Sequence, residues 1–268
     1  MRRRFSRSAN PNFVVSKEIS SVINLSDETL IWFRSLVESD PEVIGCALYG
    51  SQVFGQSDVN SDYDILCVLT DTSTNTHAKI LQSPSGQHLE FWYVSSTEFL
   101  ELQTNFDWWT FGLAHAQVFF DKTGQIRSGI EALATMPEGL AKSKVAENYD
   151  GYLNAFYRSL KTFHRNDEFG GRLHATDSVR YLIGTLFALE QRWTPYWDRI
   201  KIQWAYLEPQ GWASEELSET CLELLRTGNP SLQQKLEVKV QSVLKARGFG
   251  FVLESWGVQL EAVRLFEF

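Results

Sequence analysis

Two short stretches of sequence, VIGCALYGS at residues 43–51 and DYDILCVL at residues 62–69, decide the fold of this chain. Each contains an apolar run of strand length, which predicts a buried strand. The first stretch ends in Gly50 and Ser51, and the second begins with Asp62 and Asp64. The connection between them, residues 52–61, is rich in Gly, Ser, Asp and Asn. We therefore expect a glycine turn after one strand and two carboxylates at the head of the next.

Further strands and helices surround these two stretches. Residues 88–94 and 117–120 are β-prone, and helices are expected at residues 26–40, capped by Ser26, and 96–103. From residue 126 onward, helical periodicity replaces the strand-like runs. The sequence thus predicts an α+β protein, with a mixed β-sheet and flanking helices followed by an all-α helical bundle. We expect an N-terminal arm (1–25), a mixed-sheet domain (26–135) and a helical bundle domain (136–268).

The helical region is expected to open with two long helices. A stripe of large apolar side chains in residues 147–163 predicts the first of them. Gly170 and Gly171 are expected to break that helix, since glycine is a poor helix former. Thr176 and Asp177 are expected to begin the second, which runs to about residue 189 by its apolar spacing.

Composition and charge exclude several classes of protein. Of the 268 residues, 43% are hydrophobic and 22% are charged, which excludes wholesale disorder. The net charge of −8 disfavours extended nucleic-acid binding and suits a cationic small molecule or a metal–nucleotide complex. No apolar run is long enough to span a membrane, and no apolar core follows the basic residues 2–4, so we expect no membrane association and no secretory signal. Three widely spaced cysteines predict reduced core thiols in a cytoplasmic protein.

Asp62 and Asp64 carry the first chemical indication. Residues two apart in a strand point to the same face, so the two carboxylates would lie side by side and repel each other. A divalent cation between them would relieve this repulsion, and Mg²⁺ prefers such oxygen ligands. Glu90, an acid in the apolar run at 88–94, is the expected third ligand. The alternative for the three acids is a solvated strand start and a surface carboxylate.

Gly50 and Ser51 indicate a second role beside the acids. A glycine at the end of a strand lets the backbone approach a ligand closely. A serine that begins a short helix can offer its hydroxyl and free N–H groups to a phosphate, although it can also serve as a plain helix cap. A phosphate site beside a carboxylate cluster is what metal-assisted phosphoryl or nucleotidyl transfer requires.

The combined pattern resembles a known superfamily. Gly50-Ser51, the spacer, the acids of residues 61–65 and an acid on a later strand resemble the polymerase-beta-like nucleotidyltransferases. Within this superfamily, the length and the helical C-terminal half resemble the bacterial antibiotic (aminoglycoside and lincosamide) nucleotidyltransferases. This resemblance implies a role in antibiotic resistance. The resemblance implies transfer of a nucleoside monophosphate, with AMP as the first candidate, from ATP or another nucleoside triphosphate to a hydroxyl group, with release of pyrophosphate.

The resemblance also implies a role for each site residue. Gly50 and Ser51 would hold the triphosphate, Asp62 and Asp64 would bind two Mg²⁺ ions, and Glu90 would bind the ion nearer the acceptor oxygen. Lys161, on the first bundle helix, would reach a phosphate; the alternative is a solvated lysine. The kanamycin-modifying relatives carry a glutamate as general base one turn before this lysine, whereas Tyr157 stands four residues before Lys161 here.

Three acceptor classes stay open. The first is a small cationic molecule of the aminoglycoside type, and the second is a protein, as in antitoxins that adenylylate a partner. The third possibility is a nucleotide-binding regulatory module without catalysis. The sequence indicates no particular oligomeric state. We expect Trp108 and Trp109 to pack in the core or between domains, with stacking on a nucleobase as the alternative.

Overall fold

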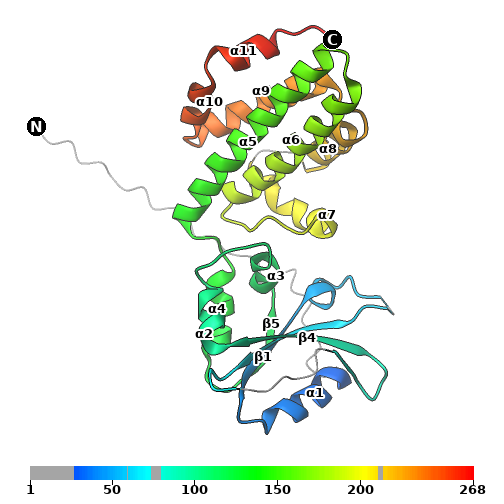
Figure 1. Ribbon diagram of the computed structural model, residues 1–268, viewed down its shortest axis with the longest axis vertical. Helices are drawn as coiled ribbons and strands as arrows, with labels where there is room; N and C mark the ends of the chain where they lie inside the picture. Colours follow the sequence, from blue (N-terminus) through cyan, green and yellow to red (C-terminus); the bar gives the residue numbers. More distant parts are fainter. Residues whose placement is uncertain (1–26, 59, 74–79, 211–213) are drawn as a thin grey trace, which may run out of the picture. The chain divides into compact units, whose positions relative to one another are not determined.

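The computed structural model describes residues 27–58, 60–73, 80–210 and 214–268. The arm expected at residues 1–25 and the cap expected at Ser26 lie outside the described residues. The chain forms two compact units, residues 1–131 and 132–268 (Figure 1). The division falls inside helix α4 (Gln125–Leu133), and the domain boundary at residues 135 and 136 stays a prediction.

The first unit contains one five-stranded mixed sheet, with the strand order β3-β4-β2-β1-β5. Strands β2 and β4 run parallel, and every other neighbouring pair is antiparallel. This sheet and the helices that follow confirm the expected α+β class. The strands are β1 (Val43–Tyr49), β2 (Tyr63–Leu69), β3 (Ile80–Gln82), β4 (His88–Ser95) and β5 (Gln117–Asp121).

Helix α1 (Glu28–Glu38) covers one face of this sheet, as Figure 1 shows. Phe33 lies in the core beside Phe91 of β4, with ring centroids 4.9 Å apart. The side chain of Asp27 caps α1, because it accepts hydrogen bonds from the backbone N–H groups of Thr29 (2.8 Å) and Leu30 (3.2 Å). Asp27 is therefore the N-cap of α1, a role that the sequence predicted for Ser26.

The opposite face of the sheet packs against α4, and two short helices, α2 (Ser96–Glu101) and α3 (Thr110–Ala114), lie between β4 and β5 in the chain. A Cβ atom on Gly45 of β1 would lie 2.7 Å from Cγ1 of Ile126, so α4 approaches the sheet closely here. Residues alternate between the two faces along each strand. Leu89 and Phe91 are therefore buried on the α1 side, whereas Glu90 and Trp92 lie on the other side.

The second unit is helical and begins with two long antiparallel helices, α5 (Glu138–His164) and α6 (Glu168–Leu189), which pack along each other (Figure 1). Short 3₁₀ helices lie at Trp197–Arg199 (η2) and Trp204–Gln210 (η3). The remaining helices are α7 (Ile200–Gln203), α8 (Ser214–Thr227), α9 (Pro230–Ala246), α10 (Gly250–Trp256) and α11 (Val258–Arg264). Among the described helices, none is both long enough and apolar enough to cross a bilayer.

The expected helix break at Gly170 and Gly171 is wrong. Both glycines lie near the start of α6, which begins after its cap Asp167 and passes through residues 176 and 177 without interruption. A Cβ atom on Gly171 would lie 2.6 Å from the ring of Phe163 on α5. The glycine therefore permits close packing of the two helices where they turn back on each other. The turn itself is made at Asn166, which has a positive φ of 61°.

The three cysteines all lie in described parts of the chain. Cys46 and Cys67 face each other on β1 and β2, and their Sγ atoms are 3.4 Å apart. Cys221 lies in the core of the second unit. All three are buried free thiols, as the sequence predicts.

Tyr63, between the two aspartates of β2, ties the strand to α1. Its hydroxyl donates a hydrogen bond to Oδ2 of Asp27 (2.9 Å). Burial, and then this hydrogen bond, raise the pKa of Tyr63 from 10.0 to about 12. Because the folded state retains the phenol proton more strongly, this contribution to stability is complete below pH 10 and is lost as the pH rises from 10 through 12.

We expect Tyr63→Phe to lower the free energy of unfolding at pH 7 by about 1–2 kcal/mol, because a hydrogen bond to a charged acceptor is lost. The variant should also lose less stability than the wild type between pH 10 and 12. Urea titrations at pH 7, 10 and 12 measure the loss of stability and its dependence on pH. Tyr181→Phe, at an exposed position, is the control. Parallel pH dependence of the wild type and Tyr63→Phe would contradict this account.

Candidate metal and nucleotide site

The structure brings together the three acids that the sequence singles out. Asp64 on β2 pairs with Glu90 on the parallel strand β4, so their side chains emerge next to each other. Asp62 lies two residues earlier, immediately before β2 begins. One carboxylate oxygen from each residue lies within 4.8 Å of the other two. Asp62 and Asp64 are half-buried and Glu90 is exposed, and we call these three residues the acid cluster.

The acid cluster fits a magnesium site in its chemistry and its dimensions. All three donors are carboxylate oxygens, the hard ligands that Mg²⁺ takes at about 2.1 Å. Two oxygens on opposite sides of one ion would then be about 4.2 Å apart, and paired ions about 3.5–4 Å apart. The spacing of up to 4.8 Å in the acid cluster therefore requires only a small side-chain adjustment around one or two ions.

Gly50 fixes the position of Asp64 in this cluster. It follows β1 directly, and its φ of +74° belongs to a region that residues with a side chain rarely adopt. A Cβ atom at this position would lie 1.9 Å from Oδ2 of Asp64. The carboxylate of Asp64 thus rests against the bare backbone of Gly50, and no other residue type leaves room for it there.

Ser51 lies beside Gly50 in a short 3₁₀ helix, η1 (Gly50–Phe54), which ends at Gly55. Its carbonyl oxygen accepts a hydrogen bond from the N–H group of Gln56 at 3.3 Å. The side chain of Gln52 donates to the carbonyl oxygen of Asp62 at 3.3 Å. This bond ties η1 to the acid-bearing segment, and it places the half-buried Ser51 in the same region as the acid cluster.

Lys161 lies in the second unit, on α5. Its Nζ atom is 3.2 Å from the hydroxyl of Tyr157 and 5.2 Å from the centre of that ring. Tyr157 therefore makes a direct contact with the lysine. The expected contact between Lys161 and a phosphate stays a prediction.

Aromatic residues lie beside the acid cluster, and the sequence assigned no site role to Trp92 or Tyr49 and gave one to Trp109 only as an alternative. Trp92 is two residues after Glu90 on β4 and shares its face of the sheet. Its ring stacks on that of Trp109, with centroids 4.9 Å apart. Tyr49, the residue before Gly50, meets Trp109 edge-on at 5.9 Å. Strand alternation identifies the position of Trp92, but no sequence signal indicates the approach of Trp109.

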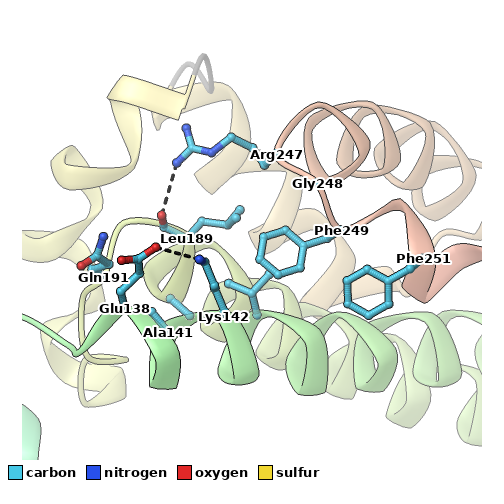
Figure 2. A pocket seen from close by; sticks show the side chains of 11 residues that line it. Glu138, Ala141, Lys142, Leu189, Gln191, Arg247, Gly248, Phe249 and Phe251 are labelled. Carbon is cyan, nitrogen blue, oxygen red and sulfur yellow. Dashed lines mark hydrogen bonds and ion pairs between the residues drawn. The ribbon is translucent and has the colours of Figure 1, made fainter. Parts of the chain in front are cut away.

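The helical unit has a pocket of its own, with a volume of about 330 Å³ (Figure 2). Lys142 pairs there with Glu138 at 2.7 Å. Arg247 donates to the carbonyl oxygen of Leu189 at 3.2 Å and pairs with Glu190 at 3.3 Å. The cations of this pocket are thus engaged by the protein itself, and none of the residues singled out from the sequence lines it.

Comparisons with known proteins add the following. A family model described as a domain of unknown function (DUF4037) matches residues 110–202. A nucleotidyltransferase-like protein from Exiguobacterium sibiricum 255-15, solved by crystallography, is similar at 13% sequence identity and a TM-score of 0.48, over 88% of this chain and 77% of that chain. No curated protein matches the sequence. The family match does not include the acid cluster, so a proposal of function depends on the geometry of the site itself.

We expect Gly50→Ala to weaken Mg²⁺ or Mn²⁺ binding by tenfold or more (about 1.4 kcal/mol), because the new methyl group displaces Asp64. It should also cost about 1–2 kcal/mol of stability through the positive φ. Calorimetric metal titration and urea denaturation measure the two effects.

Gly124→Ala is the matched control for this variant. Gly124 has a similar φ of +79°, and nothing lies within 4 Å of its Cβ position. It should therefore share the cost in stability and retain metal binding. Equal metal affinities in the two variants would show that Gly50 does not position Asp64.

Proposed function

We propose that this protein is a Mg²⁺-dependent nucleotidyltransferase. It would transfer a nucleoside monophosphate, with AMP as the first candidate, from a nucleoside triphosphate to a hydroxyl group. The observation that carries the proposal is the convergence of Asp62, Asp64 and Glu90 beside the Gly50 turn. A carboxylate cluster next to a backbone that a ligand can approach closely is suited to hold ions and a triphosphate together.

Each of the five site residues in the first unit has a defined role in this proposal. Asp62 and Asp64 would hold Mg²⁺, two ions in this proposal, with Glu90 as the third carboxylate ligand. Gly50 and Ser51 bind the triphosphate through backbone N–H groups and the serine hydroxyl. Bound Mg²⁺ would supply neutralisation of the charge that develops on the phosphates.

The reaction exchanges one P–O bond for another. The acceptor oxygen forms a bond to the α-phosphorus, while the bond between the α-phosphorus and the bridging oxygen to the β-phosphate breaks. Pyrophosphate leaves with the electron pair of that bond. Glu90, the exposed carboxylate of the cluster, is the group in this scheme that accepts the proton of the acceptor hydroxyl.

A small cationic molecule of the aminoglycoside type is the proposed acceptor. The net charge of −8 supports it, because an acidic protein attracts cations. Incubation with ATP labelled on the α-phosphate, Mg²⁺ and candidate acceptors tests the proposal. Label on a small molecule supports it, and label on a polypeptide would assign the reaction to a protein acceptor. Tight nucleotide binding without transfer to any acceptor would contradict catalysis.

We expect Asp62→Asn and Asp64→Asn each to reduce turnover by about 100-fold or more, since metal ions supply several kcal/mol of transition-state stabilisation. Their melting temperatures without metal should equal or exceed that of the wild type, because one repelling charge is removed. Turnover is measured with pure protein, and the metal-free melting temperature is measured by thermal denaturation in EDTA.

Glu101→Gln serves as the charge-matched control, because it removes an exposed acid of the same unit at the end of α2. It should retain full turnover. Near-wild-type activity in Asp62→Asn or Asp64→Asn would show that the acid cluster does not take part in catalysis.

A further inference from the structure

Three indole rings contact one another in series, beginning with Trp92 on the face of the sheet that bears the acid cluster. Trp92 stacks on Trp109 with centroids 4.9 Å apart and an angle of 28° between the rings. Trp109 in turn contacts Trp108, with centroids 4.2 Å apart and an angle of 34°. We call these three residues the tryptophan stack. It begins at Trp92, two residues from Glu90, and includes Trp108, which is 63% exposed.

The tryptophan stack is also close to the Gly50 turn. Trp109 meets the ring of Tyr49 edge-on at 5.9 Å, and Gly50 is the next residue in the chain. Tyr49 pairs with Asp64 across β1 and β2, and Asp64 pairs with Glu90 across β2 and β4. The same strand register therefore arranges the acids and the base of the stack.

Local hydrogen bonds hold the outer end of the stack in place. The N–H group of Asp107 donates to Oγ1 of Thr110 at 3.0 Å, and the N–H group of Trp109 donates to Oδ1 of Asp107 at 2.8 Å. The N–H group of Thr110 completes the turn by donating to the carbonyl oxygen of Asp107 at 3.2 Å. Trp108 thus presents its ring from a turn whose backbone is already fixed, so little conformational entropy would be lost when a ligand binds.

The exposure of Trp108 shows that it does not pack in the core of its own unit, and the other expectation, packing between domains, stays a prediction. Packing accounts for Trp92 and Trp109, which are both half-buried. Trp108 leaves most of its indole exposed, and it is connected to the site through Trp109, which contacts Trp92 and Tyr49. An indole surface of this kind stacks well on a flat aromatic ring, and stacking accepts any nucleobase because every base has a π-face.

We propose that Trp108 is the stacking platform for the base of the nucleoside triphosphate. This inference rests on the proposed function and specifies which part of the substrate the tryptophan stack binds. The phosphates would lie at Gly50 and the acid cluster, and the base, joined to them through one ribose, would continue the stack on the exposed face of Trp108. Because stacking does not depend on which base is present, ATP, GTP, CTP and UTP should all use this platform.

The test compares Mg²⁺ complexes of ATP and of inorganic tripolyphosphate, which has the phosphates and no base. We expect Trp108→Ala to weaken ATP binding by about 5-fold to 100-fold and Trp108→Phe to weaken it much less. Both variants should bind tripolyphosphate like the wild type. Calorimetry provides the dissociation constants, and urea denaturation checks that the exposed substitution leaves the fold intact.

Trp197→Ala is the matched control, since it removes a comparably exposed indole (54% exposed) from the other unit. It should leave ATP affinity and the quenching of tryptophan fluorescence by ATP unchanged, whereas Trp108→Ala should reduce that quenching.

The outcomes separate this inference from the proposed function. Unchanged ATP affinity in Trp108→Ala, with a wild type that binds both probes, would overturn the platform alone. If Trp108→Ala loses affinity only for the acceptor and retains it for ATP, the platform would likewise be overturned and the proposed function would stand. A wild type that binds neither ATP nor tripolyphosphate with Mg²⁺ would overturn the proposed function and the platform with it.

Discussion

The mutual approach of three carboxylates is the constraint on which the proposed chemistry depends. Carboxylates whose oxygens lie within 4.8 Å of one another repel when they are ionised, and water screens part of that repulsion. Strand register imposes this arrangement, because β2 pairs Asp64 with Glu90 and a bare glycine lets Asp64 lie against the preceding turn. The fold therefore stores repulsion at one point on its surface, and a divalent cation there would convert it into attraction.

The same register gives the site its second component. Alternation along β4 directs Leu89 and Phe91 into the core beneath α1, and it leaves Glu90 and Trp92 on the opposite face. Trp92 supports Trp109, and Trp109 supports Trp108 at the surface. One sheet thus presents a carboxylate cluster whose oxygens suit a divalent cation and, from Trp92, the base of the tryptophan stack, and the strand pairing cannot slip without moving both.

The parts of the fold that follow from periodicity could be predicted from sequence. The apolar runs at residues 43–49 and 62–69 and the alternation at 88–94 predict strands, and those strands bring the three acids to one place. The strand at residues 80–82 is too short to leave a pattern. The helix break at Gly170 was wrong, because helix-to-helix contact outweighed the low helix propensity of glycine.

Other features of the site depend on contacts that sequence spacing does not encode. A glycine can mark a turn, a close contact or a break, and only its neighbours in space decide which; Gly50 and Gly171 have different neighbours. Likewise, two adjacent tryptophans predict packing, and nothing in their order shows that Trp109 is half-buried while Trp108 is exposed. Residue type and periodicity therefore identify the acids, whereas the tryptophan stack requires the three-dimensional arrangement.

A crystal structure with Mn²⁺ in place of Mg²⁺ and a non-hydrolysable nucleoside triphosphate analogue tests the central claim most directly. The anomalous signal of Mn²⁺ locates the ions independently of the protein density. The account predicts peaks coordinated jointly by Asp62, Asp64 and Glu90, with the triphosphate beside Gly50. Mn²⁺ or the triphosphate bound elsewhere, with the three carboxylates facing only water, would contradict it.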